Sequence, residues 1–214
     1  MTFHWDWLIF IAKGAFVTIK YSIAATILGL FIGILLTIAS MTNNSIASNF
    51  SKFYVSVFRG TPLLIQLSLI YYGIPTCFDV KLTILQAGII SFSMNSGAYI
   101  SQIIKSGING IDKGQFEAAE SLGISYLNMM TDIILPQAIR NIVPALINEF
   151  VNLIKETAII SIIGEADIMR NATLIAQQNY NYFTPLIMAA MCYYILVTVM
   201  TNLVQYLESQ WKKY

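Results

Sequence analysis

Residues 21–51 read YSIAATILGLFIGILLTIASMTNNSIASNFS, and this run contains no Asp, Glu, Lys or Arg. A membrane-spanning helix needs about 20 mostly apolar residues, because the bilayer core is about 30 Å thick and each helical residue rises about 1.5 Å. The run is longer than one span requires, so we expect its polar residues 42–45 to form a connector. This stretch predicts that the chain crosses a membrane.

Three further stretches, residues 60–78, 82–104 and 171–207, are also free of acidic and basic residues. Each can hold one membrane helix, and the last leaves room for a polar connector at 171–181. Of the 214 residues, 57% are hydrophobic and 11% are charged, and the mean hydropathy is +0.66. Soluble domains carry about 25% charged residues, so this composition argues against a soluble enzyme. It also argues against disorder, because so apolar a chain collapses in water.

Other sequence features exclude several kinds of site. The net charge is +1 without a basic run, which argues against nucleic-acid binding. A single histidine, His4, argues against a histidine metal site, and no phosphate-binding Gly-x-x-x-x-Gly-Lys-Ser/Thr loop occurs, so the chain has no visible ATP site. We interpret Cys77 and Cys192 as fillers, with a disulfide as the open alternative. The N-terminus lacks a basic region and a cleavage site, so we treat it as uncleaved.

We predict five membrane helices in one all-α transmembrane domain that covers residues 1–214. Their approximate ranges are 14–40, 53–74, 83–107, 139–163 and 184–207. Aromatic residues lie near the predicted ends, as at membrane interfaces: Trp5, Trp7, Tyr71, Tyr72, Tyr182, Phe183 and Trp211. Gly29 and Gly33 form a small-xxx-small pair, which predicts a close helix crossing.

The basic residues predict an orientation. With the N-terminus outside, the inner segments hold Lys52, Arg59, Lys105, Lys113, Arg140, Lys212 and Lys213. The outer segments and outer helix ends hold Lys13, Lys20, Lys81 and Arg170. The larger inner set follows the positive-inside rule, so we expect the C-terminus in the cytoplasm. In this arrangement Arg59 is interpreted as an anchor at the inner membrane surface.

The longest polar stretch, residues 106–138, is an inner loop in this arrangement. Asp112 and Gln115 have the spacing of a helix capping box, and Gly123 can end the short helix in a left-handed conformation. We expect a second short helix over 125–134 that ends before Pro136. A pair of helices this short cannot enclose a core of its own, so we expect the loop to dock against another protein.

The same loop carries a resemblance to a known family. Residues 117–136, EAAESLGISYLNMMTDIILP, match E-A-A-x3-G-x9-I-x-L-P, which resembles the cytoplasmic loop signature of membrane subunits of bacterial ATP-binding-cassette (ABC) importers. Residues 59–67, RGTPLLIQL, and 98–108, AYISQIIKSGI, resemble segments of the polar amino-acid permeases among them. The chain is most similar to the permease subunit of a glutamine importer, over nearly its whole length.

The resemblance implies a type I ABC importer fold, in which solute passage and ATP hydrolysis take place on separate subunits. The loop would be a coupling helix seated on a separate ATPase subunit, which binds ATP and magnesium, while this chain needs no cofactor. A second permease copy or a sister subunit completes the membrane pair, and an extracytoplasmic binding protein delivers the solute. The residues Glu117, Ala118, Ala119 and Gly123 are assigned to ATPase docking and turn geometry, the alternative being that they only pack within the loop.

The fourth predicted helix carries an unusual polar arc. At about 100° per residue, its polar residues fall within about 120° of one another. They are Asn148, Glu149, Asn152, Lys155 and Glu156. A charge at the membrane centre costs about 2.5–3.5 kcal/mol on insertion scales, so the arc is expected to face protein or water. Either it lines the translocation path, with a glutamate meeting the substrate's ammonium, or Lys155 and a glutamate form a structural ion pair between subunits.

The second and third helices offer weaker path candidates. They are Gln66 and Thr61 on one helix and Asn95, Ser96 and Tyr99 on the other. Small polar residues in membrane helices also form hydrogen bonds between helices, so packing is the alternative for each. Near the start of its helix, Pro62 is tolerated and needs no transport role.

Together these features predict an importer permease subunit of the bacterial inner membrane that carries a polar amino acid, with glutamine first. The alternatives are an importer of a basic amino acid or opine and, from other classes, an ion channel or a membrane enzyme. We expect no catalytic residues and no metal in this chain. The polar connector at 165–182 would face outside, where it either meets the binding protein or lies on the membrane.

Overall fold

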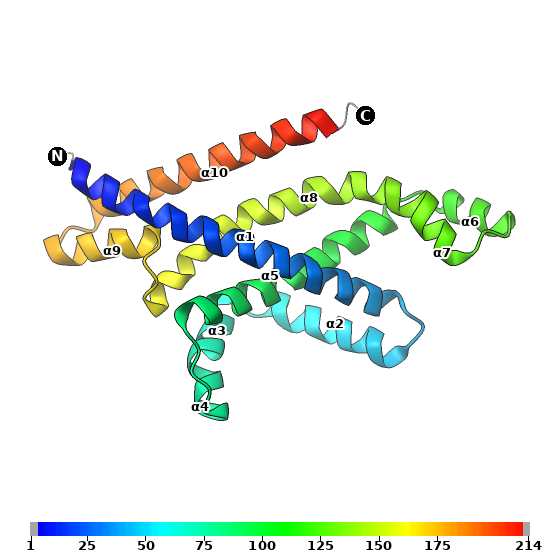
Figure 1. Cartoon of the computed structure of the whole chain (residues 1–214), viewed down its shortest axis with the longest axis horizontal. Helices are drawn as coiled ribbons and strands as arrows, with labels where there is room; N and C mark the ends of the chain where they lie inside the picture. Colours follow the sequence, from blue (N-terminus) through cyan, green and yellow to red (C-terminus); the bar gives the residue numbers. More distant parts are fainter. Residues whose placement is uncertain (1–3, 212–214) are drawn as a thin grey trace.

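The structure is a computed structural model that describes residues 4–211 and the side chains of residues 4–206. The described residues form helices and no strand (Figure 1). Lys212 and Lys213, used above for orientation, lie outside the described residues. The α-helices are α1 (Trp5–Met41), α2 (Ser45–Gly60), α3 (Leu63–Ser68), α4 (Ile74–Phe78), α5 (Ile84–Asn109), α6 (Lys113–Ser121), α7 (Tyr126–Asn128), α8 (Leu135–Glu156), α9 (Ile168–Asn179) and α10 (Phe183–Trp211). Two π-helical turns, η1 (Leu69–Gly73) and η2 (Met129–Ile134), and a 3-10 helix, η3 (Thr157–Ile163), join them.

The long helices α1 and α5 lie against each other at the centre of the molecule (Figure 1). A Cβ atom added to Gly33 would lie 2.6 Å from Ile100 Cγ2, and one added to Gly97 would lie 2.6 Å from Ile32 Cγ2. Both helices therefore need glycine at this crossing. The close crossing predicted from Gly29 and Gly33 is confirmed, and its partner is α5.

Two helices are long and apolar enough to cross a membrane unaided, α1 and residues 183–206 of α10. The bent pair Ser45–Gly60 and Leu63–Phe78 reaches the same length and hydropathy as one broken span. With 26 and 22 residues, α5 and α8 match the predicted spans 83–107 and 139–163 in length. They carry more polar residues because they pack against other helices rather than facing lipid on all sides. The five-span arrangement stays a prediction.

Where one helix was predicted over 53–74, the chain forms α2 and α3 with a bend of 104° between Ser45–Gly60 and Leu63–Phe78. The backbone is extended at Thr61 and Pro62, with ψ angles of 146° and 135°. Proline disfavours the helical conformation of the residue before it, so Pro62 ends α2 at this point. This proline therefore lies at a break between two helices. The interpretation that it lies near the start of one continuous helix is wrong.

Two π-helical turns each lie just ahead of a proline. The Leu135 amide donates to the Met130 carbonyl and the Ile74 amide to the Leu69 carbonyl, each five residues back. Since proline has no N–H and its ring clashes with the carbonyl four residues back, a shift to the wider register accommodates it. Hence the prediction that the second loop helix ends before Pro136 is wrong. The chain runs from α7 through η2 into α8 as one helical path.

The inner loop is held by a hydrophobic core that it shares with the ends of α5 and α8. Its core residues are Ile108, Ile111, Ala119, Met129, Met130, Ile134, Ala138 and Ile142. The loop thus has no core of its own, as expected, because α5 and α8 supply the other half. Asp112 caps α6 as predicted, accepting a 2.6 Å hydrogen bond from the Gly114 amide.

At the opposite end, the polar connector folds into α9, which packs against α1 and α10. Asp167 is fully buried, caps α9 through the Arg170 amide at 2.8 Å, and accepts a 3.0 Å hydrogen bond from the Tyr193 hydroxyl. Tyr21 donates to Glu165 at 3.0 Å. These bonds tie the connector to the bundle. Figure 1 places α9 at one end of the long helices and α6 and α7 at the other.

Candidate functional site

The polar arc of α8 divides between two environments. Glu149 lies in the buried stripe of α8 together with Ala138, Ile142 and Leu153. The other four members, Asn148, Asn152, Lys155 and Glu156, are exposed on the surface of this chain. In the part of the chain that the structure describes, Lys155 forms no ion pair with a glutamate. A structural pair of that kind could only form with another subunit.

Glu149 is the buried carboxylate of the arc, with 9% of its surface exposed. Its Oε1 accepts a 3.2 Å hydrogen bond from Ser96 Oγ on α5. A carboxylate has about four acceptor sites, so one hydroxyl leaves most of them without a donor. The arrangement therefore presents a partly satisfied anion between α5 and α8, and Ser96 joins the candidate site.

Gln66 and Asn95 come together at the bend between α2 and α3. Asn95 Nδ2 donates to Gln66 Oε1 at 3.0 Å and to the Phe58 carbonyl at 3.1 Å. Gln66 Nε2 donates to the carbonyls of Phe58 and Thr61, at 2.9 and 3.1 Å, and to Thr61 Oγ1 at 2.9 Å. The last carbonyls of a helix lack intrahelical donors. The two amides therefore stabilise the broken end of α2.

Arg59 lies partway along α5, and its interpretation as an inner-surface anchor stays a prediction. Its guanidinium lies over the ring of Tyr99, with Cζ 5.2 Å from the ring centroid. Tyr99 is followed on α5 by residues 100–109, which extend about 15 Å at 1.5 Å per residue. At the bend beside Pro62, α2 ends partway along α5 instead of continuing across the bundle.

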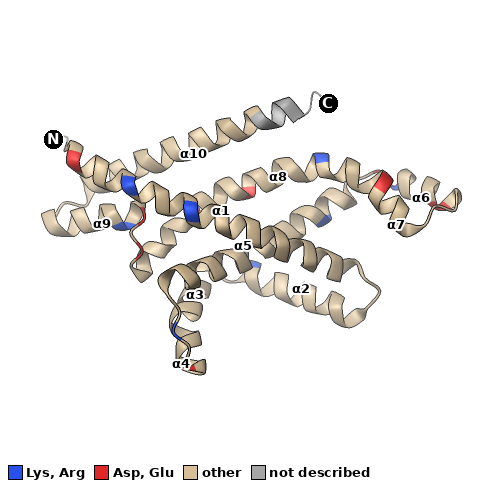
Figure 2. Ribbon diagram, viewed as in Figure 1, with Lys and Arg blue, Asp and Glu red and all other residues tan. Residues whose placement is uncertain are grey.

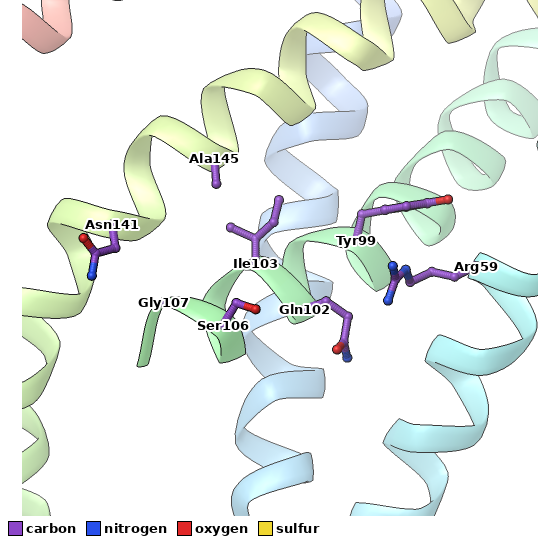
Figure 3. Close-up of a pocket in the computed structure, with 8 residues that line it drawn as sticks. All are labelled: Arg59, Tyr99, Gln102, Ile103, Ser106, Gly107, Asn141 and Ala145. Carbon is purple, nitrogen blue, oxygen red and sulfur yellow. The ribbon is translucent and has the colours of Figure 1, made fainter. Parts of the chain in front are cut away.

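A cavity of about 350 Å³ opens beside this pair (Figure 3). Its lining comes from α2, α5 and α8, namely Arg59, Tyr99, Gln102, Ile103, Ser106, Gly107, Asn141 and Ala145. Sequence reasoning selected Tyr99 but missed Gln102 and Asn141. No motif marks these two, since only the packing of three helices brings them together.

The residues predicted to dock the ATPase lie in and just after α6. Glu117 and Ala118 are exposed, whereas Ala119 is 2% exposed and packs in the loop core. Gly123 has a φ of 70°, and its amide and that of Ile124 donate to the carbonyls of Glu120 and Ala119. This pair of hydrogen bonds is a Schellman motif, so the predicted left-handed end of the helix at Gly123 is confirmed.

The same loop exposes large apolar side chains. Leu122, Tyr126 and Leu127 are 78%, 61% and 70% exposed. Figure 2 shows acidic and basic residues on α6, and η2 carries Asp132, whereas the described part of α10 up to residue 206 carries neither kind. An apolar tip ringed by polar residues is typical of a protein-docking surface.

The sequence is similar to those of known membrane transport proteins. The family model described as "Binding-protein-dependent transport system inner membrane component" matches residues 25–213. A Rickettsia typhi protein provisionally named glutamine transport system permease protein GlnP is 54% identical over 203 residues, which are 95% of this chain and 93% of that protein. The arginine transport system permease protein ArtQ of Bacillus subtilis is 43% identical over 203 residues, with the same coverage.

Solved structures agree with these sequence relatives. A crystal structure described as an amino acid ABC transporter with histidines superposes with a TM-score of 0.91 at 36% identity, covering 98% of this chain and 100% of that one. An inward-facing structure of the MetNI methionine ABC transporter has a TM-score of 0.70 at 16% identity, covering 95% of this chain and 99% of that one, and shares the fold. The helical architecture is therefore that of type I ABC importer permeases.

Proposed function

The chain belongs to the family of binding-protein-dependent transport system inner membrane components, and from this premise we propose that it carries a polar amino acid through the membrane as the permease subunit of an ATP-driven importer. Glutamine is the first candidate substrate, because the Rickettsia typhi relative at 54% identity has a glutamine permease name. Arginine is the second, since the Bacillus subtilis relative is named for it.

The observation that carries the proposal is the buried carboxylate of Glu149. It faces α5 on a helix whose neighbouring polar residues are open at the chain surface. An ammonium group supplies hydrogen-bond donors and a positive charge, which are what this anion lacks. Amino acids of every side-chain type carry that group. The site therefore fits the α-ammonium of a substrate that passes between α5 and α8.

The translocation path forms between this chain and a second permease, either another copy or a sister subunit. Four members of the polar arc are exposed on one face of the isolated chain. Facing lipid, each charged member costs about 2.5–3.5 kcal/mol on insertion scales. A matching face on a second permease removes that cost and closes the path. Within it, Asn148, Asn152, Lys155 and Glu156 provide polar lining.

The ATPase subunit docks at the loop between α5 and α8, against the exposed tip made by Leu122, Tyr126 and Leu127. ATP and magnesium bind that subunit, and this chain performs no covalent chemistry. Because η2 continues directly into α8, a displacement of the loop moves the helix that carries Glu149. Such a rigid connection is one way in which closure of the ATPase pair can switch the open side of a transporter.

The orientation follows from the docking end. The loop end lies in the cytoplasm, and α9 with the connector faces the outside, where a binding protein delivers the amino acid. The N-terminal end of α1 lies on the α9 side (Figure 1), so the N-terminus is outside and the C-terminus cytoplasmic. The protein is a multi-pass component of the bacterial inner membrane.

The test is the ATPase activity of the reconstituted complex with its cognate binding protein across a panel of amino acids. We expect glutamine or another polar amino acid to stimulate hydrolysis, and apolar amino acids to leave the basal rate unchanged. Stimulation by none of the panel would contradict the amino-acid assignment. The failure of an ATPase subunit to co-purify in mild detergent would contradict the importer assignment itself.

A further inference from the structure

An arginine near the middle of the bundle is not used by the proposed function. Arg59 ends α2 beside Tyr99 on α5, one helical turn from Ser96, which bonds Glu149. Arginine within a membrane protein is costly unless it faces a partner, water or a ligand. In the described part of the chain, no carboxylate pairs with this guanidinium. Its position therefore calls for an anionic ligand.

The Arg59 side chain rests on an aromatic ring, and hydrogen bonds fix the backbone next to it. The Tyr99 ring lies beneath it, and the face of an aromatic ring attracts a cation. The neighbouring Phe58 carbonyl accepts hydrogen bonds from both Asn95 and Gln66, which fixes the end of α2. The two amides thus support the backbone from which Arg59 extends. A preorganised planar fork of this kind suits a carboxylate, which it can bind through two parallel hydrogen bonds.

The cavity beside Arg59 faces the same way as the polar arc of α8. At about 100° per residue, Asn141 and Ala145 lie within the arc that Asn148 and Asn152 continue, toward the loop end of the helix. Figure 3 shows Arg59 on α2 and Asn141 and Ala145 on α8, with α5 between them. Arg59 is exposed at this face and so open to a solute in the path.

We propose that the cavity lined by Arg59, Tyr99, Gln102 and Asn141 is a subsite for the α-carboxylate of the transported amino acid. This inference rests on the proposed function. Arg59 binds the carboxylate, while Gln102 and Asn141 can donate to its remaining acceptor sites. The opposite charge, the α-ammonium, is met by Glu149 on α8, which accepts a hydrogen bond from Ser96, one turn before Tyr99 on α5. The pair of subsites selects α-amino acids by their two charges and leaves the side chain to other contacts.

The test uses the complex of permease and ATPase in phosphatidylcholine nanodiscs, which contain no anionic lipid to compete for Arg59. Ligand-observed saturation-transfer NMR detects weak binding without the binding protein. The probes are L-glutamine with 4-aminobutanamide and L-arginine with agmatine, the second member of each pair lacking the α-carboxylate. We expect the wild-type complex to bind one of the amino acids at least about tenfold better than its counterpart.

Arg59→Gln is expected to weaken binding of that amino acid about tenfold and to leave its counterpart unchanged, so that the preference disappears. Tyr99→Leu removes the ring and is expected to reduce the preference partly. Lys52→Gln is the matched control, because Lys52 is exposed on the same face of α2, two turns away and outside the cavity lining. It should keep the wild-type preference.

Two results would overturn the subsite: a wild-type complex with no preference within either pair, or an Arg59→Gln complex that keeps the wild-type preference. Co-purification of the ATPase subunit with each variant verifies assembly. The proposed function is tested separately by amino-acid-stimulated ATPase activity of the wild type. If the wild type passes that test and the Arg59→Gln complex keeps the wild-type preference, the subsite alone is refuted.

Discussion

At the scale of single residues, the charges inside the bundle carry the functional argument. Glu149 and Arg59 contact neighbouring turns of α5, and among the described residues each has a weak partner, the hydroxyl of Ser96 and the ring of Tyr99. Buried or membrane-facing charges are expensive without a counter-charge. In the proposed function, a zwitterionic solute supplies both counter-charges as it passes.

Glu149→Gln removes the negative charge and keeps the size of the side chain and an acceptor for Ser96. We expect the transport rate to fall at least about tenfold, because one lost charge-assisted contact costs about 1.4 kcal/mol or more. The measurement is uptake by the reconstituted complex, with assembly verified by co-purification. Asp6→Asn, at an exposed acid in the first turn of α1, is the control. Unchanged affinity and rate would remove Glu149 from the path.

Asp167 gives a pH prediction outside the membrane-spanning segments. Burial raises the pKa of its carboxyl above its ordinary value, while hydrogen bonds from the Arg170 amide and the Tyr193 hydroxyl act in the opposite direction. In the unfolded chain the pKa is about 3.9. Between the two pKa values the folded state binds more protons, so this group's contribution to stability is lost as the pH rises through the folded pKa.

The variant Asp167→Asn abolishes that titration and keeps the helix cap. We expect its melting temperature to decline less than that of the wild type as the pH rises from about 4 through the folded pKa. Thermal unfolding of the purified complex at a series of pH values measures the difference. Parallel curves for the two proteins would show that burial of Asp167 is not linked to folding.

At the scale of elements, the decisive features are where helices cross, bend and stop. Gly33 and Gly97 allow α1 and α5 to touch, the bend at Pro62 ends α2 beside Tyr99, and Gly123 turns the chain after α6. Each of these positions depends on a backbone property of glycine or proline. Substitutions there test the geometry directly.

Gly33→Ala is expected to destabilise the bundle by about 1–3 kcal/mol, because the new methyl group would lie 2.6 Å from Ile100 Cγ2. Gly60→Ala is the matched control, since a Cβ atom there meets nothing within 4 Å. The measurement is the loss of helicity on heating in detergent. Equal melting temperatures for the two variants would contradict the close α1–α5 crossing.

Gly123→Val tests the coupling loop. With a φ of 70° and no atom within 4 Å of an added Cβ, the penalty at Gly123 is backbone strain of about 1–2 kcal/mol rather than crowding. We expect more ATP hydrolysed per amino acid transported. Because asparagine tolerates the left-handed conformation, Gly123→Asn should stay near the wild type. If Gly123→Val transports with the wild-type ratio, the loop geometry has no part in coupling.

The sequence predicts some elements of this fold better than others. A long apolar run can cross a membrane only as a helix. The predicted bounds of α1, α5 and α10 therefore lie within a few residues of the observed ones, apart from the start of α1 at Trp5. The break at Pro62 was missed because proline is also tolerated near a helix start. The helix through Pro136 was missed because a π turn absorbs the proline, which depends on tertiary packing.

The candidate site divides in the same way. Glu149 and its polar arc follow from helical periodicity, since a charged residue in an apolar helix stands out. Gln66 and Asn95 were predicted as path residues, and the structure places them in hydrogen bonds at the bend, so their role in the path stays a prediction. The contact of Arg59 with Tyr99 was not predicted, because it depends on the bend after α2 and not on neighbours in sequence.

At the scale of the whole molecule, the chain has two different ends and one open polar face. The apolar tip at Leu122, Tyr126 and Leu127 fits an ATPase partner, and the α9 end fits delivery from outside. The exposed members of the polar arc need a second permease to close the path. In the proposed function a single copy is an incomplete transporter, which separates this proposal from a self-contained channel or enzyme.

The most direct measurement is uptake of radiolabelled glutamine into proteoliposomes that contain this chain and its ATPase subunit, with the binding protein on the delivery side and ATP on the other. We predict accumulation against the gradient that requires ATP, the ATPase subunit and the binding protein together. Flux without the ATPase subunit would indicate a channel. If glutamine, arginine and other polar amino acids all fail to accumulate under these conditions, the central claim is contradicted.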